Sequence, residues 1–448
     1  MFNIRLEAIA RKMIPTVSWA VLLSSLLGSP SSAPLLRGAQ DTLKLSLREA
    51  RARALFSNPD LGAARLDTVV ARGEYRQAGL LFPANPSAGF LGGGEGTEFE
   101  LSQEVEIAGQ QAARRMAGRA GLERAAAGVS NVARLTLADV DRTFYRLAAA
   151  ARRTVLAEEV AGLNRRLAEV TQRQLEAGEI SRLEFNLATV ELGRSQARLL
   201  AERREREATA AELRRLLGVP RGVVIAPLLD STPALTLSEE DTSQVVWAST
   251  PEASAVDLDS LTALALARRP DIAERTAAAR QAQAQLSVAR REAFPNLAFR
   301  ATSEVIDDGT RAFRPGVGLT LPLFNRNRGE VQVRRALAAQ VELERDALVT
   351  QVRLEVDRAL QAHEAAAAEA RVLATAVLIP ARTNRRLLET AYREGKVGLA
   401  ELLLIRNQVI DAELEYWAAW LTERETLADL AEATGEIVPP LPPRAAHQ

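Results

Sequence analysis

One very long helical stretch sets the strongest limit on what this chain can fold into. From about Gln110 to Ala177, apolar residues recur at helical spacing among alanine, arginine and glutamate. Such a helix would be about 100 Å long at 1.5 Å per residue. Because no compact domain needs a rod of this length, other helices must lie against its apolar positions. Those positions are Leu135, Val140, Phe144, Leu147, Val155, Leu156, Leu163, Leu167 and Val170.

Composition narrows the classes of function. Lys+Arg and Asp+Glu each number 57, so the net charge is zero, which argues against nucleic acid as a partner. Aromatic residues make up only 4%, a composition typical of long helices. The chain has no cysteine, its two histidines (His363 and His447) are far apart in sequence, and "GGGEG" lacks the residues of a phosphate loop. We therefore expect no enzyme, no cofactor and no metal site.

The second half of the chain restates the first, displaced by roughly 215 positions. We expect a first repeat over 41–218 and a second over 258–435, joined by a linker rich in Pro, Ser and Thr at 219–257. An apolar run after a basic start predicts a signal peptide within 1–33, and residues 436–448 form a Pro-rich tail. The matched landmarks are Leu47–Leu61 with Leu258–Ile272, Leu81–Asn85 with Ala293–Leu297, and Leu175–Leu187 with Tyr392–Leu404.

Each repeat is predicted to have the same order of elements. The first has a helix over about 45–81, a strand pair within 84–107, the long helix, a turn at Gly178 and a helix over about 181–217. The second has the corresponding elements at about 258–293, 296–324, 329–394 and 398–434, with an interruption at Pro380. The fold class is therefore mainly α with a small β part and an internal two-fold repeat.

The strand pairs alternate apolar and polar residues over about ten positions. This pattern is typical of the wall of an outer-membrane barrel, but also of a soluble sheet with one wet face. Four strands in lipid would leave two unpaired edges, which a bilayer does not tolerate. Two copies of the chain would give eight strands and three would give twelve. Polar inner faces and long helices suit a wide channel, which favours three copies.

The sequence resembles the outer-membrane efflux protein family, the TolC-like channels. The resemblance rests on the repeat, on "NPDL" with "LFPANP", on "RRPDI" with "AFPNL", and on "GLTLPLFNRNRGE". The last motif, with "SQEVEIAG", is most similar to the CzcC-type branch that serves heavy-metal pumps. The resemblance implies a homotrimer in outer-membrane lipid, with a twelve-stranded barrel continued by a periplasmic helical tube.

The resemblance also implies a role as a passive exit duct. A periplasmic adaptor and an inner-membrane pump, of the RND type, would supply cargo and energy. The tips that meet the adaptor would consist of Gly178, Glu179, Ile180, Ser181 and Leu183, and of Gly395, Lys396, Val397, Gly398, Leu399 and Ala400. The seam between barrel and tube would consist of Pro322, Leu323, Phe324 and Gly329, with the bend permitted by Pro322 and Gly329.

One acid follows each tip glycine by six residues, Glu184 and Glu401. In the family an acid here can point into the constriction, where three copies would favour cations. The alternative is a solvated helix face, and the absence of a second acid (Leu187 and Leu404 stand there) weakens a strong acidic gate. A periplasmic coiled-coil adaptor or scaffold is the other reading of the chain as a whole.

Overall fold

The computed structural model describes residues 42–93, 96–229, 257–306, 309–319, 321–394, 396–397 and 399–436. The expected signal peptide, most of the linker and the tail after Glu436 lie outside these residues. So do the tip glycines Gly395 and Gly398. Among the described residues, none of the helices combines the length and the apolar character that a membrane-spanning helix needs.

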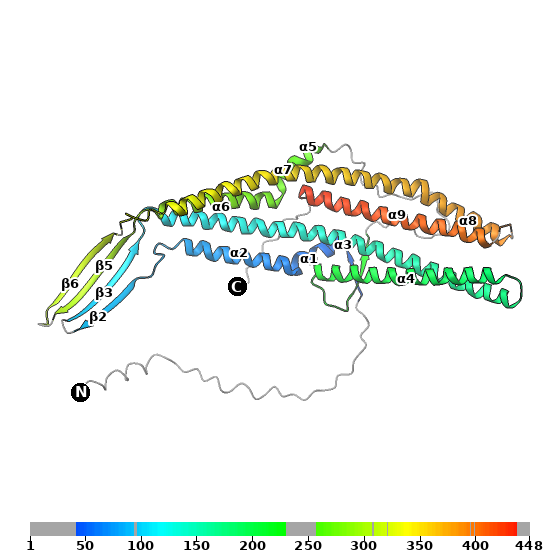
Figure 1. Cartoon of the computed structure of the whole chain (residues 1–448), viewed down its shortest axis with the longest axis horizontal. Coiled ribbons are helices and arrows are strands. Elements are labelled where there is room, and N and C mark those ends of the chain that lie inside the picture. The colour runs from blue at the N-terminus through cyan, green and yellow to red at the C-terminus, as the bar shows by residue number, and fades with distance from the viewer. Residues whose placement is uncertain are drawn as a thin grey trace, which may run out of the picture. The chain divides into compact units, whose positions relative to one another are not determined.

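The two repeats have the same order of elements, as the sequence predicts (Figure 1). The first holds α1 (Leu47–Ser57), α2 (Pro59–Ala78), β2 (Ser87–Gly93), β3 (Gly96–Val105), α3 (Gln110–Glu176) and α4 (Arg182–Leu216). The second holds α5 (Leu258–Arg268), α6 (Pro270–Arg291), β5 (Leu297–Ile306), β6 (Arg311–Leu319), α7 (Arg328–Val372), a π-helical turn η1 (Leu373–Leu378), α8 (Ile379–Arg393) and α9 (Leu399–Thr434).

The first helix of each repeat is broken where a single helix was expected. Asn58 and Arg269 are extended, with ψ of 127° and 124°, because the proline that follows each of them disfavours the α conformation. Asn58 then caps α2, since its Oδ1 accepts from the Leu61 N–H at 3.0 Å. Its amide also donates to the Leu216 carbonyl at 3.0 Å.

Each break is bonded to the end of its repeat's last helix. The guanidinium of Arg269 donates to the Ala433 carbonyl at 3.2 Å, just as Asn58 donates to Leu216. The chain leaves both helices through left-handed glycines, Gly218 and Gly435, whose positive φ few other residues adopt. A Cβ on Gly218 would lie 2.5 Å from the Ser57 oxygen, so the helix end and the break fit closely.

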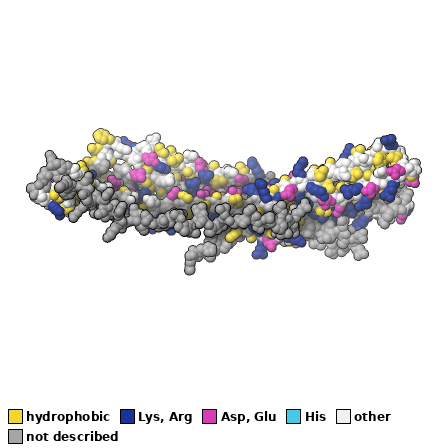
Figure 2. All heavy atoms as spheres, turned by 90° about the horizontal axis from the view of Figure 1, so that it is seen from below, with side chains coloured by type: hydrophobic (Ala, Val, Ile, Leu, Met, Phe, Trp, Pro, Cys, Tyr) yellow, Lys and Arg dark blue, Asp and Glu magenta, His cyan; other side chains and the backbone are white. Residues whose placement is uncertain are grey.

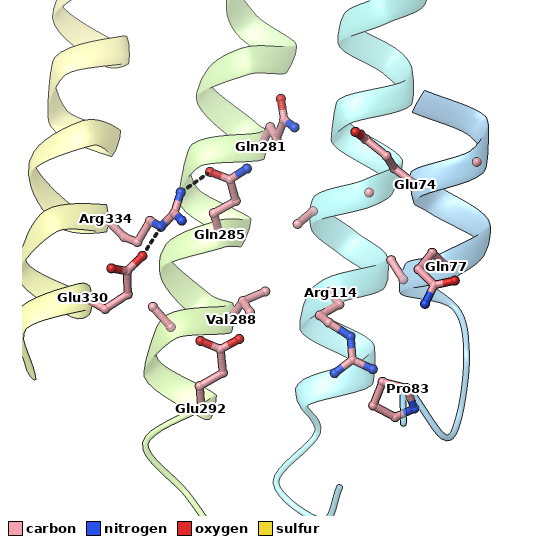
Figure 3. Close-up of a pocket in the computed structure, with 15 residues that line it drawn as sticks. Glu74, Gln77, Pro83, Arg114, Gln281, Gln285, Val288, Glu292, Glu330 and Arg334 are labelled. Atoms are coloured by element: carbon pink, nitrogen blue, oxygen red, sulfur yellow. Dashed lines mark hydrogen bonds and ion pairs between the residues drawn. The ribbon is translucent and has the colours of Figure 1, made fainter. Parts of the chain in front are cut away.

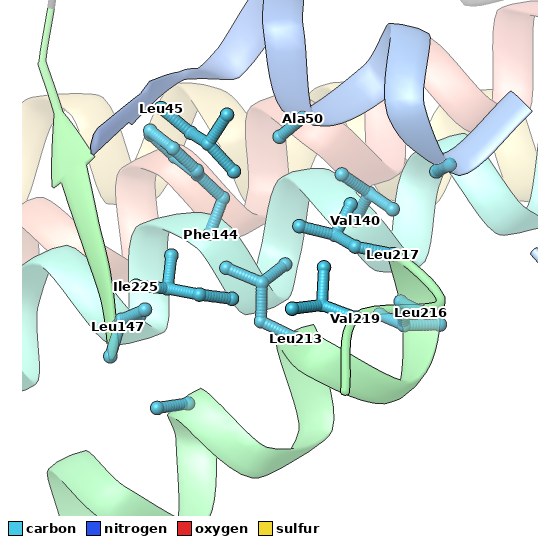
Figure 4. Close-up of a cluster of buried hydrophobic side chains, with 12 residues drawn as sticks. Leu45, Ala50, Val140, Phe144, Leu147, Leu213, Leu216, Leu217, Val219 and Ile225 are labelled. Carbon is cyan, nitrogen blue, oxygen red and sulfur yellow. The ribbon is translucent and has the colours of Figure 1, made fainter. Parts of the chain in front are cut away.

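A hydrophobic cluster lies beside each break. In the first repeat, side chains of α1, α3 and α4 pack around Val140, Phe144 and Leu213 (Figure 4). In the second, Val352 and Val356 of α7 pack with Ala265 and Ala433. Val140 and Val356 occupy matching places in "VDR", 216 positions apart. The internal repeat therefore extends from sequence to packing. Of the nine apolar positions expected on α3, Val140, Phe144 and Leu147 are buried, whereas Leu135, Val155, Leu163 and Val170 stay exposed in the single chain.

A buried ion cluster joins the two repeats at the same level. Arg269 bonds Asp271 and Glu355, each at 2.6 Å, and Arg134 of α3 donates to the Glu432 carbonyl at 2.9 Å. Burial lowers the pKa of Arg134, against the pull of Asp271. Burial alone would raise the pKa of Asp271, but the bonds from Arg269 outweigh it and lower that pKa.

Long helices pack side by side in an order set by the repeat. Above the breaks, toward the strands, α3 contacts α2 and α6, and α6 contacts α7. Below them α3 contacts α4 and α9, and α9 contacts α7 and α8. Figure 1 shows the strands at one end of these helices. At the other end, α3 turns back into α4 and α8 turns back into α9.

The interruption expected at Pro380 begins before the proline. The π-helical turn η1 ends with the Ile379 N–H donating to the Ala374 carbonyl, five residues back. Sequence landmarks lie 216 positions apart at Val140 and Val356 but 217 apart at Gly178 and Gly395. The π turn therefore accommodates the one residue that the second repeat has gained.

Two short strands were not anticipated. β1 (Thr42–Ser46) pairs in parallel with β4 (Val224–Leu228), which lies inside the segment expected as a linker. Leu45 and Ile225 bury their side chains in the cluster around Val140. Five residues are too few to establish a period of two, so the sequence pattern was weak.

We expect Asn58→Ala to lower the free energy of unfolding by about 2 kcal/mol, because it removes a cap and leaves the buried Leu216 carbonyl unpaired. Ser46→Ala is the control, since it removes only the exposed cap of α1 and should cost about 1 kcal/mol. Urea unfolding in detergent, followed by circular dichroism, measures both. Equal losses in the two variants would contradict the role of the buried carbonyl.

Candidate functional site

One four-stranded antiparallel sheet unites the strand pairs of the two repeats. The strand order is β2-β3-β5-β6, so β3 of the first repeat pairs with β5 of the second. Within the described residues β2 and β6 each pair on one side only. The four strands per chain, and the two open edges, are as the sequence predicts.

The register brings most of the large apolar residues of the four strands to one face, with Leu91 and Ile306 as exceptions on the other. Phe99 lies opposite Phe90 on one side and Ser303 on the other, and Ser303 lies opposite Phe313. The next row is Ala88, Leu101, Ala301 and Pro315, and further rows hold Phe299 with Val317 and Leu297 with Leu319. Many of these side chains are exposed, with Phe90 at 72% and Phe313 at 70%. An apolar face this exposed suits contact with lipid.

The opposite face carries charge. Arg300 pairs with Glu100 at 3.6 Å and Arg314 pairs with Glu304 at 3.0 Å. Gly316 and Gly318 also lie on this face, opposite Arg300 and Ala298, where they leave room for longer side chains. One face of the sheet is therefore apolar and the other is a charged, open surface, as a channel wall requires.

β6 ends earlier than expected. Leu321 and Leu323, which were assigned to the return strand, lie after its last residue Leu319. Leu323 N–H donates to the Leu321 carbonyl in a tight turn, and this turn ends the strand. In the first strand pair, β2 continues to Gly93 and β3 begins at Gly96.

At the seam, the chain bends through a residue that the sequence reading missed. Gly329 is the second residue of α7 and has no positive φ. The left-handed conformation falls on Asn327, with φ of 53°, and on its counterpart Gly109, with φ of 73°. Asn327 donates to the Ala289 carbonyl at 2.9 Å, which ties the start of α7 to α6. Asparagine tolerates this conformation better than most residues, which is the signal that could have located the bend.

The other seam residues are mostly exposed. Phe324 is fully exposed and Leu323 is 64% exposed, while Pro322 is partly covered. Two bonds join the strands and helices of both repeats here: Gln110 donates to Asn296 at 3.1 Å, and Arg291 donates to the Ala108 carbonyl at 2.6 Å. The seam is therefore one level at which strands pass into helices in both repeats.

An open cavity of about 640 Å³ lies beside the seam, between α2, α3, α6 and α7 (Figure 3). Arg334 bonds Glu330 at 2.7 Å and Gln285 at 3.2 Å across part of it. The lining combines charged and amide groups of several helices with apolar surface, and the apolar surface is the larger part. Its charged and amide residues are Glu74, Gln77, Arg114, Gln281, Gln285, Glu292, Glu330 and Arg334.

The first tip has the turn chemistry that its glycine predicts. Gly178 is left-handed, with φ of 75°, and donates to the Leu175 carbonyl at 3.0 Å. The Glu179 N–H donates to Gln174 at 2.8 Å, completing a Schellman turn. Leu183 is 68% exposed at the start of α4, and Ile180 is half-buried.

Glu184 has a local role that the sequence reading missed. Its carboxylate accepts from the Ser181 N–H at 2.8 Å and from the Ser181 hydroxyl at 3.0 Å. The hydroxyl accepts in turn from the Glu184 N–H, which completes a capping box. The backbone bond from Ser181, and then its hydroxyl, lower the pKa of Glu184. "SRLE" carries the sequence pattern of this box and could have revealed it.

The second tip differs in its cap. The Lys396 N–H donates to the Ala391 carbonyl, matching the bond of Glu179 one repeat earlier, and Lys396 pairs with Glu394 at 2.6 Å. Val397 is half-buried, and Leu399 and Ala400 begin α9. Glu401 lies in the first turn of α9 and is exposed. The sequence has glycine at position 398, where the first tip has Ser181. The Glu401 carboxylate therefore has no serine hydroxyl to accept from, as Glu184 has.

On the face that Figure 2 shows, side chains of both charges are interspersed with hydrophobic ones. Of the residues that the structure describes, no three His, Cys, Asp or Glu residues form a cluster that could hold a metal ion.

Comparison with known proteins agrees with this geometry. Residues 261–436 match the family described as Outer membrane efflux protein. This match covers the second repeat of the chain. The chain is 24% identical to the cobalt-zinc-cadmium resistance protein CzcC of Cupriavidus metallidurans over 387 residues, which cover 83% of this chain and 85% of that protein.

Two solved channels have the same fold as this chain. The CmeC outer membrane channel of Campylobacter jejuni matches with a TM-score of 0.70 and 16% identity, covering 87% of this chain and 85% of that one. The open state of the MtrE outer membrane channel of Neisseria gonorrhoeae matches with a TM-score of 0.65 and 22% identity, covering 87% and 88%. The fold of this chain, with strands at one end of long helices, is therefore that of these outer membrane channels.

Protonation of Glu184 should loosen the first tip. Its pKa is lowered in the folded chain, so the capping box is intact above the ordinary glutamate pKa and is lost as pH falls through the lowered one. Hydrogen exchange of the first amides of α4 should therefore gain speed, beyond its intrinsic pH dependence, as the pH drops. In Ser181→Ala these amides should exchange faster already at neutral pH. An unchanged exchange rate at neutral pH in this variant would contradict the box.

Proposed function

We propose that this chain is the passive exit duct of a tripartite efflux system, and that it acts as a homotrimer. Channels of the outer membrane efflux protein family are trimeric and pair with adaptors and pumps. The single observation that carries the proposal is the four-stranded sheet with an exposed apolar face and two open edges. Three copies would join β6 of one sheet to β2 of the next and close a twelve-stranded barrel.

The helices support the same arrangement. Several large apolar residues of α2 and α7 are exposed in the single chain, and a neighbour would cover them. The open cavity at the seam and the charged face of the sheet would then line one continuous passage. The energy and the choice of cargo come from a pump of the RND type, because a duct of this kind performs no chemistry.

The tips are proposed to dock the adaptor. The exposed Leu183 offers an apolar contact on the first tip, and Gly398, Leu399 and Ala400 hold the matching place on the second. Heavy-metal cations are the proposed cargo, on the strength of the likeness to a cobalt-zinc-cadmium resistance protein. Metal selectivity would lie in the pump, since the described residues offer no cluster of metal ligands.

The trimer is tested by gel mobility of the purified outer-membrane fraction. An unboiled sample should run near three times the mass of the chain, and boiling should collapse it to the monomer, because heat opens the shared barrel. Chemical crosslinking before boiling should retain the trimer. A soluble monomer or dimer would refute the channel and favour the adaptor or scaffold.

The constriction is tested by conductance in planar bilayers. If Glu184 and Glu401 face the passage, Glu184→Gln with Glu401→Gln should lower the preference for cations, because six carboxylates leave the trimer. Since Glu184 also caps its helix, Glu401→Gln alone is the cleaner variant. Ser181→Ala controls for loss of the cap without loss of charge. Unchanged selectivity in both glutamine variants would remove the acidic ring.

A further inference from the structure

The open edges of the chain correspond to the edges that join its own repeats. Inside the chain, β3 and α3 of the first repeat contact β5, α6 and α9 of the second. The counterparts of β3 and α3 are β6 and α7, and the counterparts of β5, α6 and α9 are β2, α2 and α4. Within the described residues, β6 and α7 have no contact with β2, α2 or α4 that matches these.

We propose that a second copy of this chain covers these edges as one repeat covers the other, so that the subunit contact repeats the intramolecular contact residue by residue. The proposal rests on the trimer proposed above and names the pairs that hold it together. Counterparts lie 211 positions apart in α2 and α6, 216 apart in α3 and α7 as far as η1, and 217 apart in α4 and α9.

A contact within each repeat agrees, to within one residue, with the spacings of α2 with α6 and of α3 with α7. A Cβ on Gly118 of α3 would lie 3.1 Å from the backbone of Tyr75 in α2. The counterpart of Gly118 is Arg334, which bonds Gln285, and Gln285 precedes the counterpart of Tyr75. The same correspondence can therefore be applied to the contacts between repeats.

Above the breaks, the transferred contact is apolar. A Cβ on Gly121 of α3 would lie 2.9 Å from the side chain of Gln281 in α6. Their counterparts are Leu337 of α7 and Val70 of α2 in the neighbouring copy. Both are exposed in the single chain, at 42% and 60%, and so are Leu66, Val69, Val333 and Leu343 around them. Apolar side chains thus stand on both edges where the repeat predicts that the edges meet.

Below the breaks, the transferred contact is an ion pair. Arg142 of α3 bonds Asp429 of α9 at 2.6 Å. Their counterparts are Arg358 of α7 and Glu212 of α4 in the neighbouring copy, so the signs of both charges are kept. Glu212 also holds Arg215 of its own helix, at 2.8 Å, and Arg358 would join this pair from across the interface.

The contact between repeats and the proposed contact between subunits differ in one cluster of side chains. The repeats are joined below the breaks by Tyr145, Trp417 and Trp420, whose rings meet edge to face. The counterparts of these residues are Gln361, Leu200 and Arg203, so the subunit contact lacks the aromatic cluster. The subunits are therefore held by a dry contact near the sheet and by a polar, salt-sensitive one toward the tips.

Cysteine crosslinking tests the apolar pair without interference, because the chain has no cysteine of its own. Val70→Cys with Leu337→Cys should form a disulfide between subunits on mild oxidation and give a trimer band that survives boiling. The matched control is Val70→Cys with Leu354→Cys, since Leu354 is also exposed on α7 but lies about 25 Å further along the helix. This pair should give monomer after boiling.

The outcomes separate the two proposals. Native mass spectrometry of the same samples reports the trimer independently of the disulfide. A trimer without the expected crosslink, or with equal crosslinking in the control, would overturn the transferred contact and leave the channel standing. A monomer in the native spectrum would overturn both.

A charge swap tests the lower contact. Arg358→Glu and Glu212→Arg should each lower the temperature at which the trimer dissociates at low salt, and the double variant should recover most of the loss. At high salt the differences should shrink, because exposed ion pairs are screened. Losses that simply add in the double variant would show that the two residues do not meet.

Discussion

The requirement that every backbone polar group in a membrane be paired governs the whole structure. A chain with four strands cannot meet this requirement alone, because its two outer strands would face lipid unpaired. In the proposed trimer, copies of the sheet pair with these outer strands, and the helices that continue the sheet have edges that meet the same copies. The exposed leucines and valines on α2 and α7 follow from this requirement.

The internal repeat provides the geometry that meets this pairing requirement. Each repeat carries one break before a proline, bonded to the end of its last helix, and one hydrophobic cluster beside it. The two breaks are chemically different: Asn58 is a small cap, whereas Arg269 belongs to an ion cluster that reaches α3 of the other repeat. The contact between repeats is thereby strengthened inside the chain, and the contact at the open edges is left to a partner.

Much of this could be predicted from the sequence because the signals are long or doubled. The 67-residue helix α3, the four strands with one apolar face and the turn at Gly178 all follow from periodicity or from glycine chemistry. Short or local features were not predicted from the sequence. The five-residue strands β1 and β4 show too little periodicity, the left-handed bend fell on Asn327 instead of Gly329, and Glu184 caps its own helix.

The sequence by itself determined the long elements, their order and the two-fold repeat, because these depend on spacing along the chain. Only the tertiary structure decided which strands of different repeats pair, which apolar residues remain uncovered, and where α7 absorbs its extra residue as a π turn. Those depend on contacts between segments hundreds of residues apart, such as Arg142 with Asp429. The periodicity of the sequence predicts that a helix face must be covered, but only the packing shows which segment covers it.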